Sequence, residues 1–184
     1  CLPGRGQGSC RLSSFARVAI AACCFLSVAA VAPAQDATGL RLADAIARAV
    51  RQHPRTTFVA CHLANLDYDL ARLGRLLDRL PNLYADISAR YAETAVTPRA
   101  AARFIAGHPD RLVYGTDMGA DPDMYRLTFR ILETLDEHFY APIFEYHWSY
   151  SGFGLEEPLL RKLYRANALE VAHRAAAGTK EPAR

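Results

Sequence analysis

The sequence predicts an α/β protein built on a small parallel sheet, and two observations carry this prediction. Helix-like and strand-like segments alternate along residues 36–176, an order typical of parallel strands joined by crossover helices. The strand-like segments are also short and apolar throughout, which favours a sheet that is buried on both faces. The chain has 184 residues, which is enough for one domain with a buried core.

The expected strands are short apolar or β-branched runs that end in polar residues. They cover residues 56–61 (TTFVAC), 83–88 (LYADIS) and 111–116 (RLVYGT). Each strand leads into a helical segment, and such crossovers are right-handed. We therefore predict that the strands pair in parallel, adjacent in chain order, with helices on one side of the sheet.

Helices are expected between and after these strands. They cover residues 42–52, 66–80, 97–107, 122–138 and 156–173. Apolar residues that recur every three or four positions predict the first two helices, and Pro81 ends the second. Thr97 is the expected N-cap of the third helix, with Pro98 at its first position. Asp121 and Pro122 begin the fourth.

Residues 1–35 have the pattern of an export signal. Arginines precede an apolar run over residues 18–31, and Ala32-Pro33-Ala34 matches a small-x-small cleavage site before Gln35. The run is shorter than the roughly 20 residues of a transmembrane helix. We therefore predict a cleaved leader and a periplasmic or secreted protein without stable membrane insertion. The alternatives are an uncleaved anchor or an accidental apolar helix, and a chain without a genuine leader would be cytoplasmic.

The predicted organisation is thus a leader (1–35), an α/β body (36–176) and a flexible tail (177–184). The net charge of +3 comes from the three arginines of the leader, since the rest of the chain holds 19 basic and 19 acidic residues. No run of Lys or Arg suits a phosphate backbone, so we expect no nucleic-acid partner. The body contains a single cysteine, Cys61, and the sequence has no CxxC pair, which argues against a zinc ribbon.

Polar side chains stand where the predicted strands end. His62 follows the first strand, Asp86 and Ser88 close the second, and Asp117 closes the third. In parallel α/β folds the functional groups collect at this edge of the sheet. A histidine and aspartates brought together there could hold a divalent metal and move protons. The structural alternatives are a histidine that caps a strand and aspartates that bind turn amides.

An aromatic segment, FYAPIFEYHWSYSGF, occupies residues 139–153. It follows the helix that comes after the third strand, so it could form the wall of a pocket beside the strand ends. We predict His147 and Trp148, at its centre, as substrate-binding residues, together with Asp86 at the end of the second strand, which would bind or orient the substrate. The alternative is a packed connector beneath the final helix.

Residues 53–171 resemble the amidohydrolase-related (type 2) family of the amidohydrolase superfamily. The matching stretches are HPRTTFVACHLANLDYDLARLGRLLDRLPNLYADISAR, DRLVYGTDMGADPDMYRLTFRILET and LLRKLYRANAL. The resemblance implies a partial (β/α)₈ TIM barrel, of which the predicted strands are the last three. It also implies that His62 is the strand-six metal ligand or catalytic histidine. Asp117 then corresponds to the strand-eight aspartate, which binds metal and transfers protons.

The resemblance further implies a metal-dependent hydrolase that acts on a small-molecule substrate, with zinc or, as second choice, manganese as the metal. The family's first-strand His-x-His motif does not occur in this sequence, so we expect a truncated chain in which metal is bound weakly or not at all. The alternatives are a non-oxidative decarboxylase of the same family and a non-catalytic exported half-barrel remnant. Exposed sheet edges in a partial barrel would also favour self-association.

Overall fold

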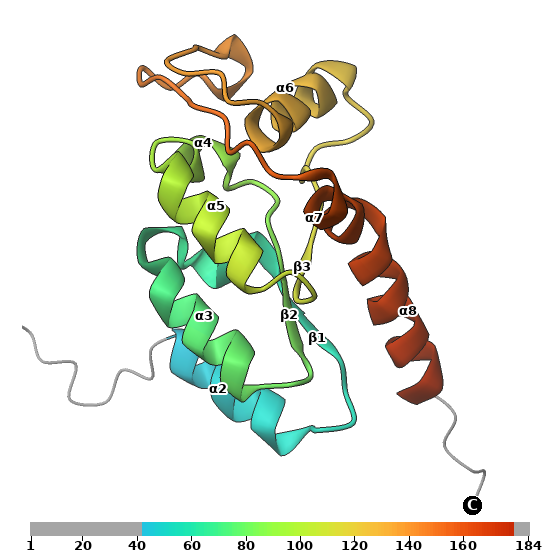
Figure 1. Cartoon of the computed structure of the whole chain (residues 1–184). Helices are drawn as coiled ribbons and strands as arrows, with labels where there is room; N and C mark the ends of the chain where they lie inside the picture. Colours follow the sequence, from blue (N-terminus) through green and yellow to red (C-terminus); the bar gives the residue numbers. More distant parts are fainter. Residues whose placement is uncertain (1–41, 179–184) are drawn as a thin grey trace, which may run out of the picture. The chain divides into compact units, whose positions relative to one another are not determined.

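The computed structural model describes residues 42–178 (Figure 1). The predicted leader over residues 1–35 lies outside this range, as do residues 179–184 of the predicted tail. Between residues 42 and 178, every helix is too short or too polar to cross a membrane.

Three short parallel strands form the sheet, in the order β1-β2-β3. They are β1 (Phe58–Ala60), β2 (Leu83–Asp86) and β3 (Leu112–Val113). The structure confirms the predicted parallel pairing and strand order. The strands are shorter than predicted because the chain leaves the ladder early. At β3, for example, the Tyr114 N–H donates 3.0 Å to the carbonyl of Leu163.

Helices surround the sheet and connect its strands. They are α2 (Leu42–Gln52), α3 (Leu70–Arg79), α4 (Tyr91–Thr94), α5 (Pro98–Gly107), α6 (Pro122–Glu133), α7 (Glu157–Arg161) and α8 (Asn167–Gly178). A π-helical turn, Lys162–Ala166, joins α7 to α8.

The helix ends differ from the sequence prediction for identifiable reasons. The helix expected from residue 66 begins only at Leu70, where the Asp69 side chain accepts the N–H of Arg72. Thr97 stands at the N-cap of α5 but makes no side-chain capping bond. The last helix continues to Gly178, five residues past the predicted end at residue 173.

The α6 helix ends at Glu133 rather than at the predicted residue 138. The chain that returns from the aromatic segment provides the reason. The N–H groups of Phe153 and Leu155 donate to the carbonyls of Ile131 and Leu132, at 2.6 and 2.9 Å. These bonds satisfy carbonyls in the last turn of the helix, which have no partner within it.

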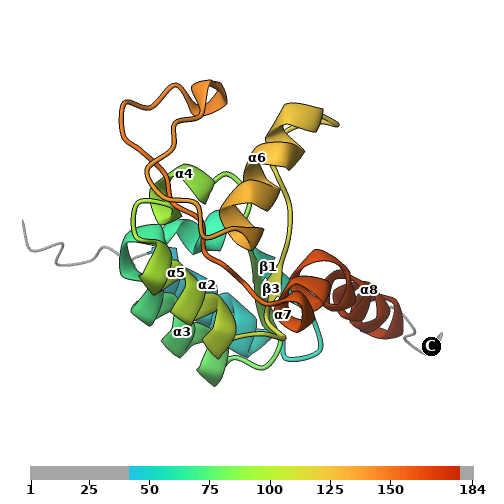
Figure 2. The same cartoon turned by 45° about the horizontal axis from the view of Figure 1, so that its top comes forward.

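Different helices pack on the two faces of the sheet. In both views α2, α3 and α5 lie on one side of the strands, and α7 and α8 lie on the other (Figures 1 and 2). Leu83 and Ala85 of β2 are buried in the core, whereas the alternating Tyr84 faces the opposite way. The guanidinium of Arg174, on α8, lies 5.9 Å from the centre of the Tyr84 ring. The prediction that all helices lie on one side is therefore wrong for the C-terminal helices.

Candidate functional site at the strand ends

A left-handed turn begins at His62, two residues past the end of β1. The residues from His62 to Asn65 all have positive φ, between 52° and 56°. For a residue other than glycine this conformation costs about 1–2 kcal/mol. Burial of Leu63 and Ala64 in the core holds the turn in place. Backbone strain of this kind is found preferentially at functional sites.

Asp86 fastens this turn to the end of β2. Its Oδ1 atom accepts the backbone N–H of His62 at 3.0 Å and that of Ser88 at 3.0 Å. The same oxygen accepts the hydroxyl of Ser88 at 2.5 Å. One carboxylate oxygen therefore joins the ends of two neighbouring strands.

The imidazole of His62 contacts residues that follow β2 and β3. Its Nδ1 atom is 3.1 Å from Ser88 Oγ and 3.2 Å from the Ser88 carbonyl oxygen. On its other side, Nε2 is 3.7 Å from Oδ2 of Asp117. The structure thus brings together His62, Asp86 and Asp117 at the predicted edge of the sheet.

Asp117 occupies the open side of the site. It follows β3 with a φ of 62°, and its side chain is 57% exposed. It lines a cavity of about 200 Å³. The apolar and aromatic part of the lining is Ala89, Ala92, Met118, Met124, Ile143, Phe144 and Tyr146. The carboxylate therefore stands where a small organic molecule could reach it.

The aromatic segment contributes to this cavity through residues other than the two predicted. Phe144 and Tyr146 line the cavity beside Asp117, whereas His147 is exposed and absent from its lining. Trp148 donates from Nε1 to the carbonyl of Ala92 at 3.4 Å and lines a separate groove. A substrate-binding role for His147, Trp148 and Asp86 stays a prediction.

The sequence analysis did not identify Arg90, which lies just before α4 and binds the left-handed turn through its side chain. Its guanidinium donates to the side-chain oxygen of Asn65. It also lies 3.5 Å from Oδ1 of Asp67 and 3.4 Å from Oε1 of Glu93. Its position four residues past the end of β2 is the same strand-end signal that identified the other site residues.

Two carboxylates, those of Asp86 and Asp117, act on the Cys61 thiol at the strand ends. The pKa of the Cys61 thiol is raised, first by the charge of Asp86, then by burial and by a hydrogen bond with Asp86, and last by Asp117. A nearby negative charge disfavours a thiolate and favours a cation. The arrangement is suited to a positively charged ligand or metal ion beside His62.

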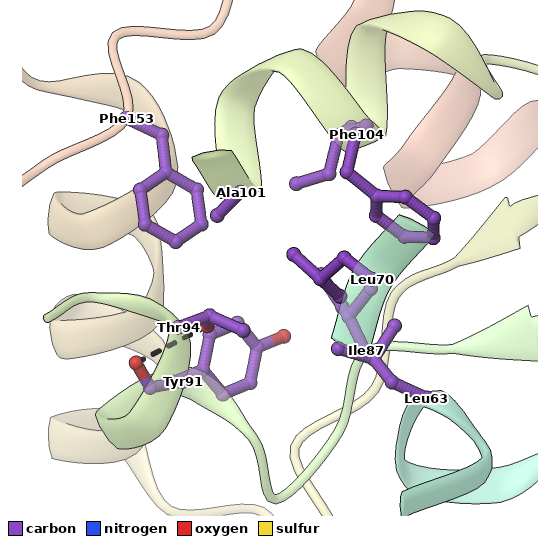
Figure 3. A pocket seen from close by; sticks show the side chains of 9 residues that line it. Leu63, Leu70, Ile87, Tyr91, Thr94, Ala101, Phe104 and Phe153 are labelled. Atoms are coloured by element: carbon purple, nitrogen blue, oxygen red, sulfur yellow. Dashed lines mark hydrogen bonds between the residues drawn. The ribbon is translucent and has the colours of Figure 1, made fainter. Parts of the chain in front are cut away.

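A second cavity, in the core beneath the turn, has a different character. Figure 3 shows side chains converging on it from several elements. The lining is Leu63, Leu70, Ile87, Tyr91, Thr94, Ala101, Phe104, Ile105 and Phe153. Its volume of about 10 Å³ is close to the minimum for one water molecule. This cavity is a gap in the packing and has no room for a substrate.

Comparison with known proteins identifies the family. A family model described as amidohydrolase matches residues 20–172, most of the chain. The chain belongs to the amidohydrolase family. The match includes all three strands and the residues from His62 to Asp117. A comparison with curated proteins gives no significant match.

A solved structure similar to this amidohydrolase is that of an amidohydrolase from Burkholderia multivorans with bound HEPES. The two chains are 19% identical, with a TM-score of 0.42. The similarity covers 72% of this chain and 49% of the solved one. This chain therefore spans about half the length of that protein.

Amidohydrolases typically use divalent metals, and two residues of this chain fit ligand positions. Two ligand atoms, each about 2.0–2.2 Å from a tetrahedral ion, are about 3.3–3.6 Å apart. His62 Nε2 and Asp117 Oδ2, 3.7 Å apart, are close to this separation. Within residues 42–178, however, no group of three or more His, Cys, Asp or Glu could hold an ion. The pair fits a metal site that needs at least one further ligand.

Proposed function

We propose that this amidohydrolase hydrolyses a small carbonyl compound at the edge where its strands end. The approach of His62 Nε2 to Asp117 Oδ2, at 3.7 Å, is the observation that carries the proposal. In this proposal β1, β2 and β3 correspond to the last three strands of a (β/α)₈ barrel. Active sites of such barrels lie at the carboxyl ends of the strands.

Each residue of the pair has a distinct role in this reaction. Asp117, exposed to the cavity, accepts the proton of the attacking water. His62 presents Nε2 to the same space and takes up that proton, and the imidazolium stabilises the oxyanion that forms. As the C–O or C–N bond breaks, the imidazolium returns the proton to the leaving oxygen or nitrogen. A divalent metal bound by the pair would supply Lewis-acid polarisation of the carbonyl in place of the imidazolium, because its bond to Nε2 would use the lone pair that otherwise takes the proton.

The cavity beside Asp117 limits the size and polarity of the substrate. Its volume is about 200 Å³, and Ile143, Phe144 and Tyr146 give it an apolar, partly aromatic wall. Burial of an apolar group contributes about 25 cal/mol per Å² of surface removed from water. We therefore propose esters, lactones or amides that carry a compact apolar group.

The experiment compares two variants of the full chain. Metal content and hydrolysis of a panel of aryl esters, lactones and N-acyl amides are measured after supply of zinc or manganese. Asp117→Asn should lower both bound metal and kcat, the latter by at least about 100-fold. Asp123→Asn is the control, because this exposed aspartate on α6 pairs with the equally exposed Arg126.

Three results would overturn the proposal. The first is an Asp117→Asn variant with unchanged kcat and metal content. The second is release of CO₂ from aromatic acids without any hydrolysis, which would identify a decarboxylase. The third is a chain that binds neither metal and turns over no member of the panel, which would identify a non-catalytic remnant.

A further inference from the structure

The contacts of the His62 ring determine which nitrogen carries the proton. Nδ1 lies 3.2 Å from the backbone carbonyl oxygen of Ser88. A carbonyl oxygen can only accept a hydrogen bond, so Nδ1 must be the donor. In the neutral ring the lone pair is then on Nε2, the nitrogen that faces Asp117.

The Ser88 hydroxyl reinforces this arrangement because its own proton is already committed. It donates to Oδ1 of Asp86 at 2.5 Å and is left to accept from His62 Nδ1 at 3.1 Å. Asp86 Oδ1 is itself 4.0 Å from Nδ1, so the carboxylate acts on the ring through the hydroxyl. The three groups form a directional chain from imidazole to serine to carboxylate.

The hydrogen-bonded series from imidazole to serine to carboxylate is sheltered from solvent, whereas the Asp117 side chain is exposed. Ser88 is only 6% exposed, and the Asp86 side chain is 16% exposed. Oδ1 of Asp86 also accepts the backbone N–H of His62. The end of β2 therefore holds both the ring and the main chain of His62 and presents little surface to a substrate.

We propose that Ser88 and Asp86 are positioning residues for His62. They keep its imidazole in the Nδ1–H tautomer and direct the Nε2 lone pair at the space beside Asp117. Their importance for turnover rests on the proposed function, but the tautomer itself does not. Partners that orient a ligand histidine in this way typically change metal affinity or activity by about 10–100-fold when they are replaced.

The tautomer can be measured directly in the full chain. Two-bond ¹H–¹⁵N correlation of histidine-labelled protein, at a pH where the ring is neutral, distinguishes Nδ1–H from Nε2–H. We expect His62 to be Nδ1–H in the wild type. Ser88→Ala removes the hydroxyl acceptor but keeps the backbone carbonyl, so it should raise the share of the Nε2–H form, which predominates in a free imidazole side chain, without abolishing Nδ1–H.

Kinetics then test whether this positioning matters. Ser88→Ala should lower kcat by about 10–100-fold and change KM by less than about 3-fold, since the substrate does not touch Ser88. Ser88→Thr keeps the hydroxyl and should restore the tautomer and most of kcat. Thr128→Ala is the control, because it removes a fully buried hydroxyl, bonded to Tyr114, elsewhere in the fold.

The outcomes separate this inference from the proposed function. A wild-type Nε2–H tautomer, or a Ser88→Ala variant with unchanged tautomer and kcat, overturns the positioning role. If the tautomer follows the expected pattern but the chain hydrolyses nothing, the proposed function fails and the positioning of His62 stands. If Asp117→Asn abolishes hydrolysis while Ser88→Ala changes nothing, the proposed function stands and the positioning role of Ser88 fails.

Discussion

His62 and Asp117 share a left-handed backbone conformation, with φ of 56° and 62°, and their side chains meet at 3.7 Å. Ala89, just past the end of β2, has a φ of 53°. A strained residue thus follows each of the three strands. Because the strands are parallel, these three residues lie together at the carboxyl end of the sheet. Strain of this kind persists only where surrounding contacts impose it, and it concentrates at ligand sites and active sites. The backbone therefore supports the same location for the site as the side chains do.

Ala89→Gly should stabilise the protein by about 0.5–1 kcal/mol. Ala89 is exposed, so little packing is lost. Glycine removes the left-handed penalty of about 1–2 kcal/mol, partly offset by its greater freedom in the unfolded chain. The measurement is the free energy of urea unfolding.

Ala100→Gly is the matched control for that measurement. Ala100 is also exposed but lies inside α5, where glycine should destabilise by about 0.5–1 kcal/mol. Equal destabilisation by the two substitutions would show that Ala89 carries no strain in solution.

Arg90→Ala should lower the free energy of unfolding by about 1–3 kcal/mol. The change leaves Asp67 and Glu93 without their shared cation and Asn65 without its donor. Loss of a partner in a partly buried network costs the desolvation of the groups left behind. Thermal or urea unfolding measures the effect.

The control for Arg90 is Arg161→Ala. Arg161 pairs with Glu157 on α7, but both side chains are more than 70% exposed. Pairs of this kind contribute about 0–1 kcal/mol. A similar loss of stability in both variants would remove the special role of Arg90 as a clamp.

Stability should fall steeply above about pH 10 because of buried tyrosines. Burial raises the pKa of Tyr91 well above the ordinary value of 10.0. Below that pH the phenol is neutral in both states, so its contribution is fully present. Above it the unfolded chain releases a proton that the folded chain keeps, and unfolding becomes more favourable by about 1.4 kcal/mol per pH unit.

Urea unfolding at pH 8, 10 and 11 tests this dependence. Tyr91→Phe should flatten the decline, although it also removes the hydroxyl's 2.7 Å bond to the Gly115 carbonyl. Tyr68→Phe should leave the slope unchanged, because Tyr68 is 78% exposed. A Tyr91→Phe slope equal to that of the wild type would contradict the assignment.

The fold and the pairing of His62 with Asp117 could be predicted because both follow from local patterns. Apolar runs bounded by turn residues mark the strands, and parallel pairing brings their carboxyl ends to one edge. The left-handed turn after β1 could not be predicted, because none of its residues is a glycine. In the turn, the His62 N–H donates a hydrogen bond to Asp86, which is remote in sequence.

The aromatic segment shows a related limit of the sequence. Its composition indicated a pocket wall, but not which residues face the cavity. That choice depends on how the chain turns at residues 142–145, where Glu145 takes a φ of 55°. Tyr146 is consequently placed at the cavity and His147 is turned to solvent.

The last prediction concerns association through β1, an edge strand of the sheet. Val59 is 38% exposed there, whereas the opposite edge, at β3, is covered where Tyr114 bonds to Leu163. Exposed apolar edge strands pair with other chains, and a lysine on the edge prevents this. We therefore expect concentration-dependent association of the wild type in sedimentation velocity.

Val59→Lys should shift the protein towards the monomer at every concentration. The control is Val96→Lys, which alters an equally apolar residue outside the sheet and should not change the association. Val96 is 50% exposed, between α4 and α5, so the two variants add the same charge to the surface. If both variants dissociate the protein alike, repulsion between charged chains explains the effect and the edge of β1 does not. A wild type that sediments as a monomer throughout would show that β1 is already covered.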